Sequence, residues 1–124
     1  MSESARETLD RCVGLLQSLK GEELVVLDVR EVADFADYFL ICSGNSDTHV
    51  RALGDTVYEG MKKAGQQPWH TEGMDTRKWV LFDFVDVVVH IFLPKTREFY
   101  GLERLWGDVP AEHIEDIPPV AEVS

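Results

Sequence analysis

A Ser-Gly-Asn-Ser turn at residues 43–46 is the first feature whose residue types could carry out chemistry. The turn stands between an apolar run and a helical pattern, and the free N–H groups at the N-terminus of a helix hold phosphates. A turn of this kind beside strands that carry carboxylates is also typical of the active sites of metal-dependent nucleotidyltransferases, in which the carboxylates bind Mg²⁺. The candidate metal ligands are Asp28, Asp37, Asp83 and Asp86.

The spacing of these aspartates argues against a metal centre. No Asp-x-Asp pair lies near the turn, and the chain has neither Gly-x-x-x-x-Gly-Lys nor Gly-x-Gly-x-x-Gly, the patterns of phosphate-binding loops. Ser46 is therefore expected to cap the following helix, and the aspartates are expected to be surface charges. No cofactor and no metal are predicted. A nucleotidyltransferase that uses this turn with Asp83 or Asp86 stays open as the enzymatic alternative.

The histidines and cysteines offer two further kinds of chemistry. The four histidines fall in different segments, without the spacing of metal ligands: His49, His70, His90 and His113. His90 interrupts an apolar run, where an imidazole needs a hydrogen-bond partner or a pocket, so we expect a core or edge histidine, with a general base as the alternative. Cys42 with His90 and an aspartate would have the composition of a nucleophile triad, but a cysteine inside an apolar strand is expected to be inert.

Large aromatic residues and basic residues alternate toward the C-terminal end of the chain and indicate a binding surface. The rings are Trp69, Trp79, Tyr100 and Trp106, and a core of this size cannot enclose all of them. Residues 77–104 hold five basic and four acidic side chains, so this block is net +1 and the other residues total −12. Trp, Tyr and Arg dominate interface energetics, which predicts a protein-docking face. The alternative is that the rings only cover the end of a small sheet.

Two amphipathic helices and five strands are predicted to position these residues. Helices are expected over residues 3–20 and about 47–64, strands over 24–29, 38–42, 66–71, 78–84 and 87–93, and a short helical turn within 95–105. Only eight residues join the first two strands, too few for a helical crossover, so these strands are expected to be antiparallel. The predicted class is α/β, with a mixed sheet of about five strands and helices packed on it, because an apolar central strand needs cover on both faces.

The composition fits one acidic domain. The 124 residues carry 23 acidic and 12 basic side chains, a net charge of −11. We place the domain at residues 1–110 and an acidic, flexible tail at residues 111–124, which hold four acids, two adjacent prolines and no Lys or Arg. So acidic a chain is not expected to wrap DNA or RNA, and it suits a basic protein partner. The N-terminal residues have no signal-peptide pattern, and the longest apolar run, residues 87–93, is too short to span a membrane, which predicts a cytoplasmic protein.

Six short segments follow one another in a specific order: ADYFLI at residues 36–41, SGNS at 43–46, HTEG at 70–73, WVLFDF at 79–84, DVVVHIF at 86–92 and REFYGLERLW at 97–106. Together they resemble the ribosomal silencing factor family, also called RsfS or Iojap, from the first helix to Pro110. The resemblance implies a compact α/β domain similar to nucleotidyltransferases but without their catalytic carboxylates, and therefore a protein that is not an enzyme. The family usually has glycine at the position of Val85, where a hairpin turn can need a positive φ.

The same resemblance implies a function. The family binds the large ribosomal subunit through the ribosomal protein uL14, sterically blocks association with the small subunit and represses translation under starvation or in stationary phase. Related organellar proteins act in ribosome assembly, so a large-subunit assembly factor is the alternative. Family members also self-associate, which makes a homodimer plausible. The predicted docking face comprises His70, Lys78, Trp79, Tyr100, Leu102, Arg104, Leu105 and Trp106.

Overall fold

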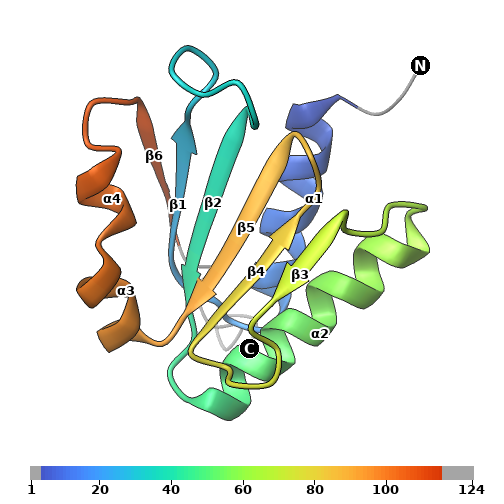
Figure 1. Cartoon of the computed structure of the whole chain (residues 1–124). Helices are drawn as coiled ribbons and strands as arrows, with labels where there is room; N and C mark the ends of the chain where they lie inside the picture. Colours follow the sequence, from blue (N-terminus) through green and yellow to red (C-terminus); the bar gives the residue numbers. More distant parts are fainter. Residues whose placement is uncertain (1–3, 116–124) are drawn as a thin grey trace, which may run out of the picture.

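The computed structural model describes residues 4–115, which form a six-stranded mixed sheet with helices on both faces (Figure 1). The helices are α1 (Ala5–Ser18), α2 (Asp47–Lys63), α3 (Pro94–Tyr100) and α4 (Leu102–Leu105). The strands are β1 (Glu22–Asp28), β2 (Tyr38–Ser43), β3 (His70–Glu72), β4 (Trp79–Asp83), β5 (Val87–Phe92) and β6 (Ala111–Ile114). The spatial order is β3-β4-β5-β2-β1-β6, with β2 and β5 parallel and all other neighbours antiparallel. The predicted α/β class is confirmed.

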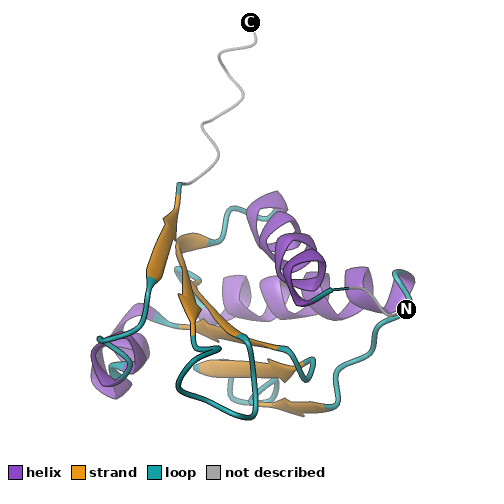
Figure 2. Cartoon of the chain, turned by 90° about the horizontal axis from the view of Figure 1, so that it is seen from above, coloured by secondary structure: helices purple, strands orange, loops and turns teal. Residues whose placement is uncertain are grey.

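The two long helices lie on one face of the sheet, and α3 and α4 lie on the opposite face (Figure 2). Each long helix begins at a serine that satisfies a free backbone donor. Ser4 Oγ accepts from the Glu7 N–H at 3.1 Å, and Ser46 Oγ accepts from the His49 N–H at 3.1 Å. The predicted cap at Ser46 is therefore present. No helix within residues 4–115 has the length and apolarity needed to cross a membrane.

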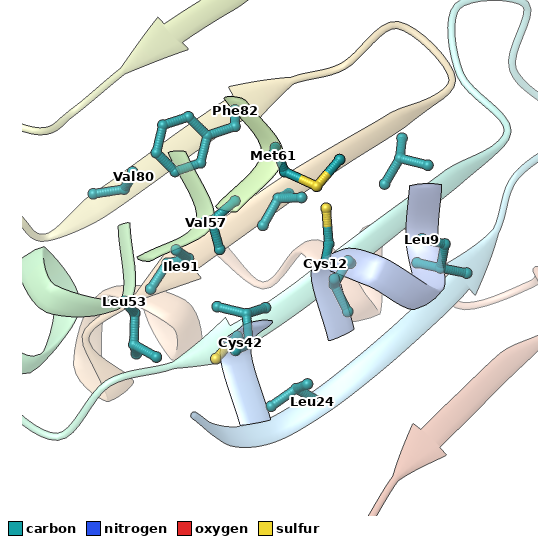
Figure 3. Close-up of a cluster of buried hydrophobic side chains, with 14 of the residues drawn as sticks. Leu9, Cys12, Leu24, Cys42, Leu53, Val57, Met61, Val80, Phe82 and Ile91 are labelled. Atoms are coloured by element: carbon teal, nitrogen blue, oxygen red, sulfur yellow. The ribbon is translucent and has the colours of Figure 1, made fainter. Parts of the chain in front are cut away.

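The main core lies between the sheet and the two long helices (Figure 3). The apolar stripe of each helix faces the sheet: α1 contributes Leu9 and Cys12, and α2 contributes Leu53 and Met61, all fully buried. β2 and β5 are buried along their whole length. These two strands have helices on both sides, which explains why their sequences are almost entirely apolar rather than alternating.

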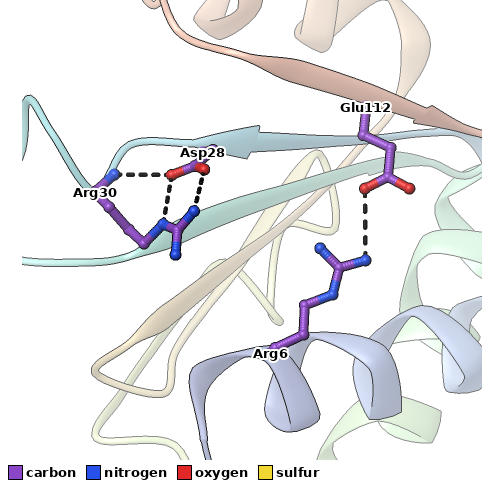
Figure 4. A network of polar contacts seen from close by, with 4 residues as sticks. All are labelled: Arg6, Asp28, Arg30 and Glu112. Carbon is purple, nitrogen blue, oxygen red and sulfur yellow. Dashed lines mark hydrogen bonds and ion pairs between the residues drawn. The ribbon is translucent and has the colours of Figure 1, made fainter.

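The structure has one strand more than predicted. Residues 111–114, placed at the start of the predicted tail, form β6, which pairs with β1 so that Val26 lies opposite Glu112. An ion pair of 3.5 Å between Arg6 and Glu112 links β6 to α1 (Figure 4). The strand was missed because a short edge strand can be polar on both faces, so its sequence lacks the apolar signal of a core strand. The rest of the predicted tail, residues 116–124, lies outside the described residues.

The other edge strand, β3, is shorter than predicted. It covers three residues and begins at His70 rather than at residue 66. Pro68 has no N–H to donate to a ladder, so pairing starts only after it, with the Trp69 N–H donating to the Asp83 carbonyl at 2.7 Å. β3 therefore pairs with the last three of the five residues of β4 and leaves Trp79 and Val80 without a strand partner on this side.

The tight turn between β4 and β5 has a backbone conformation that L-residues rarely adopt. Val85 has a φ of +76°. The Asp86 N–H donates to the Phe84 carbonyl at 3.0 Å across this residue, and the Val85 N–H donates to Asp83 Oδ1 at 2.8 Å. These bonds define a tight three-residue turn with the positive φ that glycine adopts without strain. The hairpin predicted for this segment is present, with valine at its strained position.

Candidate functional site

A continuous row of rings crosses the sheet face opposite α1 and α2. Neighbouring ring centroids are 4.7 to 6.5 Å apart, the range of favourable aromatic contacts. In spatial order the rings are Phe35, Trp106, Phe39, His90, Trp79, Tyr100 and Phe99. They come from the loop after β1, from β2, β4 and β5, and from the segment that contains α3 and α4. Residues distant in the sequence thus form one surface.

His90 is the buried centre of this row. The indole N–H of Trp79 donates to His90 Nδ1 at 3.1 Å, and an indole can only donate, so the neutral imidazole carries its proton on Nε2. Burial lowers the pKa of His90 to about 4, because a charged ring would lose its hydration. Its Nε2 has no hydrogen-bond partner among the described residues. A neutral histidine with one nitrogen bound to Trp79 orients the neighbouring ring, as expected of a core histidine.

An arginine fixes α3 and α4 against the sheet. The Arg97 guanidinium donates to both carboxylate oxygens of Glu103, at 2.9 and 3.0 Å, and to Ser43 Oγ at 2.8 Å. These bonds join α3 to α4 and both helices to the end of β2, and the Arg97 side chain is only 12% exposed. Hydrogen bonds from Arg97 lower the pKa of the Glu103 carboxyl below its usual value. Gly101, with a φ of +59°, allows the sharp change of direction between the two helices.

The predicted docking residues divide into supporting and exposed side chains. Trp79, Leu102 and Trp106 are half-buried and pack on the second core cluster. The exposed members are Lys78, Tyr100, Arg104, Leu105 and His70. The first four lie in or directly before elements of the ring row. His70 lies apart from the ring row. It pairs with Asp83, which is four residues from Trp79 on β4, a distance of roughly 13 Å along the strand.

Two exposed rings in the row are missing from the predicted face. Phe35 is 62% exposed and Phe99 is 78% exposed. The rings of Phe99 and Tyr100 meet edge to face at 5.0 Å. The two residues are adjacent in the REFYGLERLW segment, so the position of Phe99 beside a predicted docking residue could have identified it. Phe35 lies in the connection between β1 and β2, residues 29–37, and an apolar ring among the acids of that connection was a sequence feature that could have identified it.

The two ends of the row carry opposite charge. At the Phe35 end, a cavity of about 490 Å³ lies between the start of the connection that contains Phe35 and the residues that follow Trp106, and it is lined by Asp28, Arg30, Glu31, Val32, Asp108, Val109 and Pro110. Arg30 binds both oxygens of Asp28, at 2.7 and 3.0 Å, which lowers the pKa of that carboxyl and leaves Glu31 and Asp108 as net negative charge (Figure 4). At the other end, beside Phe99, a second cavity of about 670 Å³ is lined by two lysines and no acid.

The Ser43–Ser46 turn and the aspartates considered as metal ligands lie far apart. Ser43 pairs with Phe92 at one end of the sheet, and Asp83 pairs with Val88 at the other end, roughly 13 Å away along β5. The Ser43 hydroxyl is already bound by Arg97, and the turn is fixed by His49, whose Nδ1 accepts from the Asn45 N–H at 2.9 Å. The turn and Asp83 therefore cannot share one Mg²⁺. Over residues 4–115, no three His, Cys, Asp or Glu side chains are grouped to hold a metal ion.

Comparison with known proteins gives consistent matches along the chain. Residues 2–124 match the family model described as "Ribosomal silencing factor during starvation". The chain is 37% identical over 114 residues to ribosomal silencing factor RsfS of Halalkalibacterium halodurans, covering 92% of this chain and 97% of the relative. It is 42% identical over 96 residues to RsfS of Bacillus subtilis, covering 77% and 81%. A crystal structure of a Chromobacterium violaceum protein is similar with a TM-score of 0.83 at 30% identity, covering 94% and 98%. The chain belongs to the ribosomal silencing factor family.

Proposed function

We propose that the protein silences ribosomes in the cytoplasm by occupying the large subunit rather than by catalysis. It binds the ribosomal protein uL14, sterically blocks association with the small subunit and so represses translation under starvation or in stationary phase. Family membership supports a ribosome-directed role. The observation that supports a docking mechanism is the ring row, which is fixed from below and exposes apolar side chains above.

We assign the protein contact to the acidic end of the row. Phe35 is 62% exposed, and its ring lies 6.5 Å from that of Trp106. Leu105, the residue before Trp106, is 73% exposed. Exposed apolar groups of this size on a small domain mark an interaction surface. The neighbouring acids complement the basic side chains of a ribosomal protein and speed its association. In this assignment Trp79, Leu102 and Trp106 support the surface, and Leu105, Arg104 and Phe35 touch the partner.

The test is sedimentation of the purified protein with large subunits, followed by addition of small subunits and a count of joined particles. The unchanged protein is expected to co-sediment and to reduce joining. Leu105→Glu places a charge in the apolar contact and is expected to weaken co-sedimentation at least tenfold, or about 1.4 kcal/mol. Trp69→Ala removes an equally exposed ring outside the row and serves as the matched control. Equal binding by both variants would remove this face from the proposal.

A role in large-subunit assembly is the second candidate. The chain is 34% identical over 105 residues to a mouse protein named "Mitochondrial assembly of ribosomal large subunit protein 1", of which it covers 46%. Binding to large subunits without reduced joining would favour assembly over silencing. The exposed face also fits a homodimer, and sedimentation of the protein alone at rising concentration tests it.

A further inference from the structure

The basic end of the ring row is a groove with the chemistry of a nucleotide site. It lies between the segment that leads into β4 and the exposed side of α3, with a volume of about 670 Å³. Its walls are formed by Thr76, Lys78, Trp79, Lys95, Thr96, Phe99 and Tyr100. A volume of this size is in the range of small-ligand sites.

The groove is positively charged, whereas the chain as a whole is negatively charged. The protein has a net charge of −11. Four arginines are bound to carboxylates: Arg6, Arg30, Arg51 and Arg97. Lys78 and Lys95 both line the groove, and neither forms an ion pair with a carboxylate anywhere in residues 4–115. The nearest acid on α3, Glu98, lines a different cavity with Arg97 and Arg104. Two uncompensated ammonium groups favour an anion.

The aromatic rings of the groove indicate which class of anion it fits. Phe99 is 78% exposed and Tyr100 is 52% exposed, so both present ring surface to a ligand. Tyr100 is held from behind by Trp79, whose centroid lies 4.7 Å away, and Trp79 is in turn held by His90. A fixed aromatic platform beside lysines is the arrangement that stacks bases and neutralises phosphates of single-stranded nucleic acid. An acidic peptide would use the lysines and leave the ring faces without a stacking partner.

We propose that this groove binds one unpaired nucleotide of ribosomal RNA, with its phosphate between Lys78 and Lys95 and its base against Phe99 and Tyr100. The proposal rests on the proposed function, because the large subunit supplies the RNA next to the docked protein. The acidic remainder of the chain repels further phosphates and restricts the contact to one or two of them. Protein contact at one end of the row and RNA contact at the other would fix the orientation of the domain on the subunit.

The first test uses the isolated protein and the single-stranded hexanucleotide U6 at low salt, with binding followed by tryptophan fluorescence. The double variant Lys78→Gln/Lys95→Gln is expected to weaken binding at least tenfold, and Phe99→Ala by a similar factor. The slope of log K against log salt should be −0.7 to −1.4, as expected for one or two phosphates on a single strand. The double variant Lys62→Gln/Lys63→Gln, at the end of α2, is the charge-matched control and should bind as the unchanged protein does. Equal loss in both double variants, or stronger binding of hexaglutamate than of U6, would overturn the nucleotide assignment.

The second test separates this proposal from the ribosome-docking function. Large subunits that carry the unchanged protein are irradiated with ultraviolet light, and the RNA-linked peptide is identified. Linkage within residues 94–100 supports the groove, and its loss in Phe99→Ala while co-sedimentation persists supports stacking on that ring. Co-sedimentation without any RNA-linked peptide from this segment overturns the nucleotide proposal and leaves the docking function intact. Absence of co-sedimentation by the unchanged protein contradicts the docking function itself, and U6 binding then reports on the groove alone.

Discussion

The indole of Trp79 and the imidazole of His90 are joined by a hydrogen bond of 3.1 Å between adjacent strands, β4 and β5. The bond fixes which ring nitrogen of His90 carries the proton, and it holds Trp79 where its other side meets Tyr100 at 4.7 Å. A hydrogen bond to the buried His90 therefore sets the position of the exposed rings above it. The orientation of the docking face depends on an interaction inside the domain.

Loss of this bond should destabilise the protein more than loss of ring area would. Trp79→Phe keeps a ring in place but leaves His90 Nδ1 buried without a donor, which costs about 1–3 kcal/mol. Urea unfolding followed by circular dichroism measures this difference. Trp69→Phe, at a ring that is 79% exposed, is the matched control and should change the free energy of unfolding by less than about 0.5 kcal/mol. Similar midpoints for the two variants would contradict a structural role for the bond.

The stability of the protein should fall between pH 6.5 and 4 because of His90. Its pKa is lowered from 6.5 to about 4 by burial, so within this range the unfolded chain binds a proton that the folded chain does not. The free energy of unfolding therefore rises with pH across this window and reaches its full value above pH 6.5. As the pH falls toward 4, it decreases by roughly 3 kcal/mol. The carboxyls of Asp28 and Glu103 have lowered pKa values in the folded protein. The stability that these two carboxylates add is therefore lost only as the pH falls below their usual pKa values of 3.8 and 4.5.

Replacement of the histidine isolates its part of this pH dependence. His90→Gln keeps an acceptor for the Trp79 indole and removes the titrating group. Urea midpoints of the unchanged protein should drop from pH 6.5 to pH 4.5, whereas those of His90→Gln should stay nearly constant. Parallel curves for the two proteins would show that another group causes the loss.

Arg97 is expected to be the most sensitive residue of the segment that carries the docking surface. Arg97→Ala leaves Glu103 and Ser43 without their donor and detaches α3 and α4 from the sheet, at a cost of about 2–3 kcal/mol. Hydrogen exchange of residues 94–106 should become faster, because the helices open locally. Arg51→Ala breaks an exposed pair with Asp55 at 3.6 Å and should cost less than about 1 kcal/mol. Unchanged exchange in Arg97→Ala would show that packing alone holds the segment.

The elements with strong apolar patterns could be predicted from the sequence. β2 and β5 are almost entirely apolar, apart from His90 and the terminal Ser43, because helices cover them on both faces. The stripe of α2 at Val50, Leu53 and Val57 predicts its buried side. β6 could not be found in this way, since its position depends on pairing with β1 rather than on burial of its own side chains.

The composition of the docking face could be predicted, but its arrangement could not. Trp79, Tyr100 and Trp106 were candidates because of their type. Their assembly into one row depends on the parallel pairing of β2 with β5, which places Phe39 next to His90 and is not visible in either strand alone. The exposure of each side chain could not be predicted from the sequence either. Trp106 packs on Phe39 at 5.3 Å, whereas the adjacent Leu105 is 73% exposed.

Val85 stores strain that a single substitution should release. Its φ of +76° forces a β-branched side chain into a region that costs of order 1–3 kcal/mol, and the side chain is 56% exposed, so little burial is lost on its removal. Val85→Gly should raise the free energy of unfolding by about 1 kcal/mol after the greater flexibility of the unfolded chain is subtracted, and thermal unfolding should shift upward by a few degrees. Val32→Gly removes a valine of similar exposure whose φ is not positive, and it should be neutral or destabilising. Destabilisation by both substitutions would mean that the hydrogen bond from the Val85 N–H to Asp83 already compensates for the strained turn.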